Sequence, residues 1–333
     1  MMKRFNRVKS LIKKGLRMSQ FDHADASNDN SQRTADHWSE NTAESEAFAD
    51  NTYWLAIPPV QRRHQSKATQ GEDVDWAHYF LERYFPNRQG LLMASIGCGS
   101  GGLERALASW NAFSHCDAYD IAPGAIKLAK QHAADAGFTQ INYEVRDINS
   151  LEWPSDHYDA VWFNGSLHHI EQLERVYQQV SHTLKPGGYL FFNEYIGPSR
   201  FDFTERQKQV MDAVFKLLPQ RFKRSFIPNY PHPYLQATPI PDPVEVQRVD
   251  PSEAVRSDEI MSILPDYFDI LEFNKMGGTI LQFLLAGIAG NFHPSDKDAM
   301  RMLDMLFAIE DTLIDIGDIQ SDFACVAATP KKK

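Results

Sequence analysis

The chain has 333 residues, of which 43% are hydrophobic and 23% are charged, and this composition is ordinary for a globular protein. Its formal net charge of −10 argues against a nucleic-acid backbone as the partner, because such binding depends on clustered Lys and Arg. Its longest strongly apolar stretch, residues 280–289, is much shorter than the ~20 residues of a membrane-spanning helix. The three cysteines form no CxxC pattern, so we expect a reducing, cytoplasmic location and predict no metal site.

The N-terminal region divides into a basic segment and a polar segment. Residues 1–17 contain basic but no acidic residues, with apolar residues at helical spacing, which is typical of peripheral contact with an anionic membrane surface. A frayed tail, or upstream sequence if the protein starts at Met18, explains the same segment. Residues 18–36 are rich in Asp, Asn, Ser and Gln, so we expect residues 1–36 to form a disordered leader.

A helical cap is predicted for residues 37–90, before the first strand. Residues 37–70 carry spaced aromatic side chains, and we expect this helical region to break at Pro58-Pro59. Residues 76–84 indicate a further helix.

Residues 91–197 alternate between apolar runs and helical patterns. The runs predict strands at 91–96, 115–119, 141–145, 158–163 and 189–193. The helical patterns occupy 103–110, 123–136 and 173–184. Strands that alternate with helices predict βαβ units, and therefore an α/β fold with a doubly wound, mostly parallel sheet. Ligands bind such sheets at the carboxyl ends of the strands.

The pattern changes after Gly197. We expect residues 198–267 to form an insertion on the substrate side. It contains helices at 203–218 and 257–264 and a proline-dense extended loop at 228–251. Residues 268–333 are expected to complete the sheet, with strands at 268–273 and 321–328 and a helical segment, 279–316, between them.

A glycine-rich loop, Gly97-Cys98-Gly99-Ser100-Gly101-Gly102, follows the first strand and opens a helix. Glycines let the backbone turn sharply and approach a bound cofactor closely. Asp120 ends the next strand, where a carboxylate can accept hydrogen bonds from both ribose hydroxyls. This pattern fits NAD as well as S-adenosylmethionine. Asp147, after the third strand, can accept from an adenine amino group or can serve as a turn residue.

Five motifs in order make this region resemble the class I S-adenosylmethionine-dependent methyltransferase family, especially its small-molecule branch. They are Ile96–Gly101, Tyr119-Asp120-Ile121, Arg146-Asp147-Ile148, Leu167-His168-His169 and Leu184-Lys185-Pro186-Gly187-Gly188. The resemblance implies a seven-stranded sheet with an antiparallel last strand. One departure is Ser95, because many members have an acid there, near the methionine part of the cofactor.

The predicted cofactor is S-adenosyl-L-methionine, and its predicted binding residues lie after successive strands. They are Gly97, Cys98, Gly99, Gly101, Asp120, Ile121, Asp147, Ile148 and Asn164. Asn164 can hold the acceptor instead, and Cys98 is interpreted as a small packing residue rather than a nucleophile.

The predicted catalytic residues are His168, His169 and Glu194. A base that takes the proton of a hydroxyl acceptor speeds its methylation, and histidine titrates near neutrality. Because adjacent side chains usually point apart, we expect at most one of the two histidines to face the substrate. Packing and helix capping are the alternatives for them, and an ion pair with Arg200 or another surface cation is the alternative for Glu194.

Two further residues are predicted to bind the acceptor. Tyr195 ends the fifth strand beside Glu194, and Arg200 follows it closely. Arg200 and Arg256 can bind an anionic group of the substrate, although surface ion pairs explain both residues as well.

The function expected from these features is O-methylation of a sugar, a glycan or another small hydroxylated metabolite. This preference rests on a weaker resemblance of segments 201–203, 250–253 and 277–279 to bacterial glycan and secondary-metabolite methyltransferases. Three alternatives stay open: N- or C-methylation of a small molecule, an NAD-dependent dehydrogenase, and a non-catalytic cofactor-binding protein. A nucleic-acid acceptor is disfavoured because no aromatic and basic stripe accompanies the acidic charge.

Overall fold

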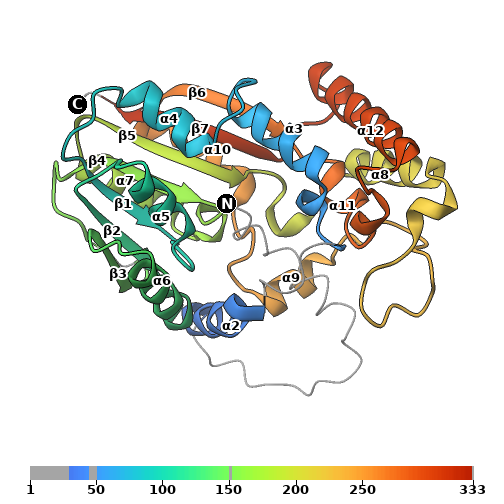
Figure 1. The fold of residues 1–333 in the computed structure, drawn as a ribbon, viewed down its shortest axis with the longest axis horizontal. Coiled ribbons are helices and arrows are strands. Elements are labelled where there is room, and N and C mark those ends of the chain that lie inside the picture. The colour runs from blue at the N-terminus through green and yellow to red at the C-terminus, as the bar shows by residue number, and fades with distance from the viewer. Residues whose placement is uncertain (1–29, 45–50, 150–151, 332–333) are drawn as a thin grey trace.

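The computed structural model describes residues 30–44, 51–149 and 152–331 (Figure 1). At its centre is a seven-stranded sheet with the order β3-β2-β1-β4-β5-β7-β6. Strands β1 to β5 are joined by parallel pairings, and β7 runs antiparallel between β5 and β6. The strands are β1 (Leu92–Ile96), β2 (His115–Asp120), β3 (Ile141–Val145), β4 (Tyr158–Asn164), β5 (Leu184–Tyr195), β6 (Phe268–Gly277) and β7 (Phe323–Pro330). The predicted α/β fold with an antiparallel last strand is confirmed.

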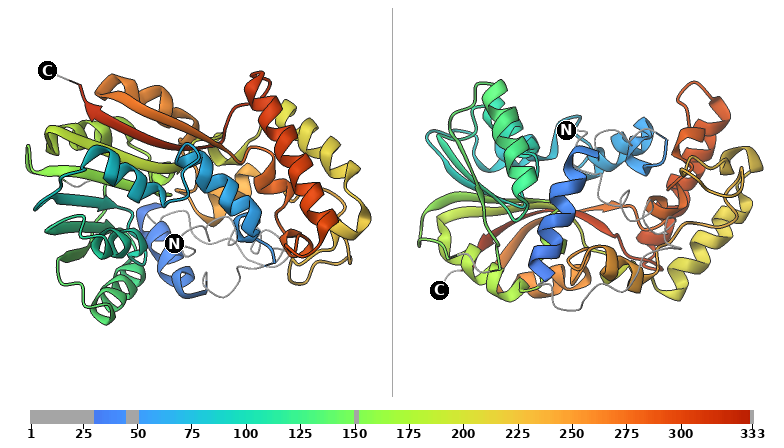
Figure 2. Two further views of the ribbon diagram at one scale, coloured as in Figure 1. Left: turned by 45° about the horizontal axis from the view of Figure 1, so that its top comes forward. Right: turned by 90° about the horizontal axis from the view of Figure 1, so that it is seen from below.

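Helices cover both faces of this sheet. On the way to β5 they are α2 (Asn30–Glu44), α3 (Pro58–Ala68), α4 (Trp76–Tyr84), α5 (Gly102–Ser109), α6 (Pro123–Asp135) and α7 (Leu173–Thr183). After β5 they are α8 (Glu205–Leu217), α9 (Pro243–Val249), α10 (Ile260–Tyr267), α11 (Leu281–Leu284) and α12 (Lys297–Asp315). Helices α8 and α12 lie beside each other, away from the parallel strands (Figures 1 and 2).

The strands are apolar on both sides because each side packs against helices. On β5, Phe191 stacks on Phe80 of α4 with ring centroids 5.3 Å apart. The next residue, Phe192, belongs to the opposite cluster, together with Val180 of α7 and Leu264 of α10. Successive side chains of a strand point to opposite faces, so one continuous apolar run fills two cores.

Two expectations about local structure were wrong. Helix α2 begins at Asn30, inside the segment that we expected to be disordered. The proline-dense segment 228–251 contains α9, which begins at Pro243 and is capped by the Asp242 carboxylate. The expected break at Pro58-Pro59 is confirmed, because Ile57 is extended and Pro58 begins the new helix α3, where the first turn does not use the amide hydrogen that proline lacks.

Helix α2 is held by residues far away in the sequence. It runs from α6 to the end of α9 (Figure 2). On one side of the helix the Ser39 hydroxyl accepts a hydrogen bond from the amide of Gly124 at 3.2 Å. On another side the indole of the neighbouring Trp38 donates to Asp250 at 2.9 Å. Tertiary contacts therefore stabilise a helix whose polar composition alone does not predict one.

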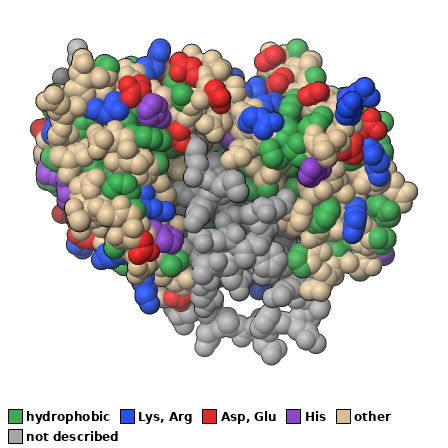
Figure 3. All heavy atoms as spheres, in the orientation of Figure 1, with side chains coloured by type: hydrophobic (Ala, Val, Ile, Leu, Met, Phe, Trp, Pro, Cys, Tyr) green, Lys and Arg blue, Asp and Glu red, His purple; other side chains and the backbone are tan. Residues whose placement is uncertain are grey.

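In the part of the chain that the structure describes, no helix combines the length and the apolar character needed to cross a membrane. The predicted membrane contact of residues 1–17 lies outside the described residues. On the face drawn in Figure 3, acidic and basic side chains are intermixed rather than gathered by sign.

Candidate active site

The glycine loop after β1 has a backbone that other residues adopt only with strain. The φ angles of Gly97, Gly99 and Gly101 are +63°, +54° and +78°, in the left-handed region that favours glycine. A Cβ atom on Gly97 would lie 2.3 Å from the Cβ of Ser166. The loop thus turns tightly against the segment that follows β4, and Cys98 is fully buried within it, as its interpretation as a packing residue predicts.

Asp120 connects this loop to the turn after β2. One of its carboxylate oxygens accepts the Gly99 amide hydrogen at 2.7 Å, and the other accepts that of Ala122 at 2.9 Å. A carboxylate oxygen can accept two hydrogen bonds, so each keeps capacity for a ribose hydroxyl. Ile121, half-buried, follows directly.

The other predicted cofactor residues follow β3 and β4. Asp147 accepts hydrogen bonds from the amide and the side chain of Asn149 at 2.9 and 3.0 Å, which agrees with its alternative interpretation as a turn residue. Ile148 is partly buried against the hydrophobic cluster that contains Phe192. Asn164 is the last residue of β4 and pairs with Asn193 of β5. With the glycine loop, these residues lie at the carboxyl ends of the parallel strands, where an adenosyl cofactor fits.

The departure at Ser95 is offset by a carboxylate from α5. The Ser95 hydroxyl donates a short hydrogen bond to Glu104, and both side chains are buried. A carboxylate is therefore present beside β1, although the chain has none at position 95. The sequence analysis did not identify Glu104, because only the packing of α5 on the sheet brings it there.

Glu194, at the end of β5, holds the predicted catalytic residues in place through hydrogen bonds. It is 1% exposed. One oxygen accepts the amide hydrogens of Ser166 and Leu167 at 2.6 and 2.8 Å, and the other lies 2.7 Å from Nδ1 of His168. Glu194 therefore binds the turn after β4 rather than Arg200, its alternative partner.

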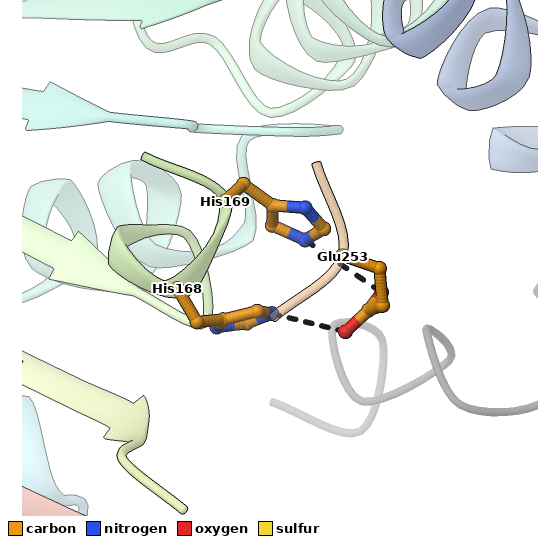
Figure 4. Close-up of side chains that lie close together, drawn as sticks. All are labelled: His168, His169 and Glu253. Carbon is orange, nitrogen blue, oxygen red and sulfur yellow. Dashed lines mark ion pairs between the residues drawn. The ribbon is translucent and has the colours of Figure 1, made fainter. Parts of the chain in front are cut away.

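Both histidines face the same side, so the expectation that they point apart was wrong. Residues Leu167–His169 form a 3-10 turn, in which successive side chains are only about 120° apart. Their rings lie 4.3 Å apart between centroids. Nε2 of His168 is 3.5 Å and Nε2 of His169 is 3.9 Å from the carboxylate of Glu253 (Figure 4). We refer to these three residues as the histidine cluster.

Glu253 reaches this cluster because its segment is tied down. The half-buried Arg200 guanidinium donates to the main-chain carbonyls of Asp250, Pro251 and Glu253 at 3.4, 2.5 and 2.9 Å. Burial lowers the pKa of the Arg200 guanidinium. The contact of Arg200 with the substrate stays a prediction. Arg200 and Ala254 have φ angles of +57° and +49°, a conformation that persists only where surrounding contacts impose it.

Tyr195 and Arg256 are engaged by neighbours. The Tyr195 hydroxyl donates to the carbonyl of Pro198 at 3.0 Å, and burial raises its pKa well above the ordinary value. Its role toward the acceptor stays a prediction. Arg256 forms ion pairs with Glu174 and Glu259, both at 2.7 Å, so the alternative interpretation of Arg256 is confirmed.

Sequence reasoning did not assign a role to Glu253 or Asp250. Both lie at or just after the end of the proline-dense segment 228–251. That segment has no hydrophobic periodicity, so no sequence pattern distinguishes these two carboxylates from others nearby. The single signal was the weak family resemblance of segment 250–253.

Comparison with known proteins identifies the core. Residues 94–192 match the family model described as a methyltransferase domain. The chain contains a class I S-adenosylmethionine-dependent methyltransferase domain. Its cofactor is S-adenosylmethionine, which sets aside the NAD-dependent dehydrogenase alternative.

Two curated relatives of this methyltransferase domain are named ubiquinone biosynthesis O-methyltransferase. The one from Xylella fastidiosa strain 9a5c is 36% identical over 104 residues, which are 31% of this chain and 41% of the relative. The one from Xanthomonas axonopodis pv. citri strain 306 is 26% identical over 167 residues, 50% of this chain and 65% of the relative. The chain thus spans less than two thirds of the length of these relatives.

One solved structure resembles the fold of this chain over most of its length. Geranyl diphosphate C-methyltransferase from Streptomyces coelicolor A3(2) aligns with 92% of this chain and 100% of its own, with a TM-score of 0.50 and 10% identity. This likeness concerns the fold alone.

Proposed function

We propose that this chain transfers the methyl group of S-adenosylmethionine to a hydroxyl oxygen of a small molecule, such as a sugar, a glycan end or another hydroxylated metabolite. The observation that carries the proposal is the pair formed by His168 and Glu194, 2.7 Å apart, directly beside the glycine loop. A hydroxyl must lose a proton during methylation, so a held imidazole favours oxygen as the acceptor. The names of the two O-methyltransferase relatives agree with this choice.

The residues that would hold the cofactor are those after strands β1 to β4. The glycine loop lets the backbone approach it, and the Asp120 carboxylate accepts from its ribose hydroxyls. Asp147 accepts from the adenine amino group, and Asn164 holds its amino-acid end. When bound, S-adenosylmethionine supplies a methyl group on sulfonium sulfur that is already activated for displacement.

His168 would accept the proton of the acceptor. An ionised carboxylate has no hydrogen to donate, so the bond to Glu194 places the histidine hydrogen on Nδ1. Nε2 then carries the electron pair that takes the proton, and Glu194 stabilises the resulting imidazolium. A positioned base of this kind contributes about 10²–10⁴-fold in rate.

The acceptor would lie between the histidine cluster and the segment after β5. Tyr195 and Arg200 belong to this side, and Arg200 also holds the turn that carries Glu253. The glycan preference is supported by the weak resemblance of segments 201–203 and 250–253.

Calorimetric titration followed by an acceptor screen tests the proposal. S-adenosylmethionine and S-adenosylhomocysteine are expected to bind, and NAD is not. Methyl-labelled cofactor is then incubated with sugars and phenols, each paired with its amino analogue as a control. Transfer to hydroxyl compounds supports the proposal, whereas transfer to amines alone contradicts it. Cofactor binding with no turnover on any acceptor favours the non-catalytic alternative.

A further inference from the structure

The hydrogen positions on both histidines follow from their neighbours. Glu194 is an acceptor, so the 2.7 Å bond requires the hydrogen of His168 on Nδ1. The Ser252 hydroxyl donates its single hydrogen to Asp250 at 2.7 Å. It must therefore accept from Nδ1 of His169, at 2.8 Å.

Both neutral imidazoles then present an electron pair at Nε2. Both Nε2 atoms lie near the Glu253 carboxylate, at 3.5 and 3.9 Å, and both ion-pair lines in Figure 4 meet at Glu253. One ligand atom from each of the three residues lies within 4.8 Å of the others. Three electron-rich atoms that converge inside a protein repel one another unless a positive charge lies between them.

Buried carboxylates surround the histidine cluster. Glu194, Asp250 and Glu253 are buried carboxylates, and among the described residues the guanidinium of Arg200 donates to the main chain of segment 250–253. Three buried carboxylates so close together favour further positive charge beside them. A divalent cation can supply that charge, and so can protonated histidines.

We propose that His168, His169 and Glu253 bind one divalent transition-metal ion of the zinc type. Two imidazole nitrogens and one carboxylate are a donor set for such ions and leave coordination positions open. Bond lengths of about 2.0–2.2 Å in a tetrahedral site put the donors about 3.3–3.5 Å apart. The observed separations are 3.5 Å from His168 Nε2 to Oε1 of Glu253 and 3.9 Å from His169 Nε2 to Oε2. One ligand atom from each of the three residues lies within 4.8 Å of the others, so the donors are somewhat wider apart than a bound ion would hold them.

The partners behind the histidines strengthen this assignment. Metal-binding histidines donate their other ring hydrogen to a carboxylate, a carbonyl or water, which fixes the ring and its tautomer. Here Glu194 has that role for His168, and Ser252 with Asp250 has it for His169. This metal site was not predicted from the sequence, because its donor residues come from two separate segments and include no cysteine.

The role of the ion, unlike the site itself, rests on the proposed methyl transfer. An acceptor hydroxyl that occupies an open position would become more acidic. The methyl group then passes from sulfur to oxygen, the neutral thioether leaves, and the hydroxyl proton goes to water. In that case His168 is a metal ligand and not the base, and the ion itself makes the acceptor hydroxyl more acidic.

The binding test uses the full chain, stripped of metal by a chelator. Zn²⁺ is titrated against a chromophoric chelator, and Co²⁺ is followed by its visible absorption. We expect one equivalent of Zn²⁺ to bind, the intense Co²⁺ spectrum of a four-coordinate site, and no competition from Mg²⁺. Absence of stoichiometric Zn²⁺ binding overturns the inference and assigns the balancing charge to protonated histidines.

Variants locate the ion. Glu253→Gln and His169→Ala should abolish stoichiometric binding, and Ser252→Ala should lower the Zn²⁺ affinity by about 10–100-fold. The control is His182→Ala, an exposed histidine on α7 that pairs with Ser155, which should bind Zn²⁺ as the wild type does. Thermal unfolding and S-adenosylmethionine titration check that each variant is folded. Unchanged Zn²⁺ affinity in Glu253→Gln contradicts the site.

The two proposals can fail separately. Metal-stripped protein that methylates a hydroxyl at the full rate refutes the catalytic role of the ion and leaves the methyl transfer standing with His168 as the base, whereas absent stoichiometric Zn²⁺ binding refutes the site. Stoichiometric Zn²⁺ binding without methyl transfer to any hydroxyl refutes the proposed function and leaves the ion site standing.

Discussion

The glycine loop and the histidine cluster lie side by side but are built in different ways. The loop is one continuous segment whose shape is defined by backbone angles, with Asp120 as its main side-chain anchor. The cluster assembles side chains from the turn after β4 and from segment 250–253, and Glu194 at the end of β5 holds His168 in place. A cofactor shared by many enzymes can be bound by a local backbone shape, whereas the side that meets the acceptor depends on contacts distant in sequence.

Strain is distributed differently in the two regions. In the loop, positive φ angles fall on glycines, which adopt them at little cost. Near the cluster they fall on Arg200 and Ala254, at about 1–3 kcal/mol each. The contacts of segment 250–253 with Arg200 must offset that cost, so the cluster should be the more sensitive region to changes in side-chain partners.

The largest expected effect is on catalysis, in Glu194→Gln. The amide can still accept from the Ser166 and Leu167 backbone, but its NH₂ group faces Nδ1 of His168 and favours the wrong tautomer. We expect kcat to fall by about 10²–10⁴-fold, with S-adenosylmethionine affinity nearly unchanged. Nitrogen NMR shifts of His168 should report the change of tautomer. Glu174→Gln, an exposed carboxylate on α7, is the control, and equal kcat values for the two variants would refute the role of Glu194.

The next effect is on folding and concerns the loop. In Gly97→Ala, the new Cβ meets Ser166 and the residue must keep a positive φ angle. We expect the free energy of unfolding to fall by about 2–4 kcal/mol, measured by urea denaturation without cofactor. Gly99→Ala is the matched control, because its φ angle is similar and no atom lies within 4 Å of the added Cβ. It should lose about 1 kcal/mol, and equal losses would contradict the close contact.

A smaller effect should separate the cofactor side from the acceptor side. Asp120→Ala removes the proposed ribose acceptor, so S-adenosylmethionine affinity should fall by about 10- to 150-fold, or roughly 1.5–3 kcal/mol, by calorimetry. Asp117→Ala, on the same strand but paired with Tyr158 and Asn142, is the control and should bind normally. Unchanged affinity in Asp120→Ala would remove this residue from the cofactor site.

The smallest effect lies outside both regions. Hydrogen bonds from Arg256 lower the pKa of Glu174 from 4.5 to about 2, so the folded state favours the ionised carboxylate. That stabilisation is present above about pH 4.5 and is lost as the pH falls toward about 2. Both side chains are partly exposed, so it amounts to less than about 1 kcal/mol. The difference in unfolding free energy between wild type and Arg256→Gln should therefore shrink from about pH 6 to about pH 3. A difference that is constant with pH would contradict the pairing.

Features that depend on neighbours in the chain could be predicted from the sequence. The order of strands and helices from 91 to 197 follows from hydrophobic periodicity, and the glycine loop with Asp120 follows from the turn that a buried strand must make before a helix. Because β-α-β units make the strands parallel, the carboxyl ends of the strands lie together and place these residues at the same end of the sheet.

Tertiary structure alone decided which side chains complete that edge. Helix α2 forms because Trp38 and Ser39 find partners on Asp250 and Gly124, and Glu253 meets His168 and His169 only after Arg200 holds its segment. Such partners are separated by long stretches of chain, and no local pattern records them. Backbone shape is a local property that a few residues specify, whereas the balance of buried charges depends on every segment that packs around them.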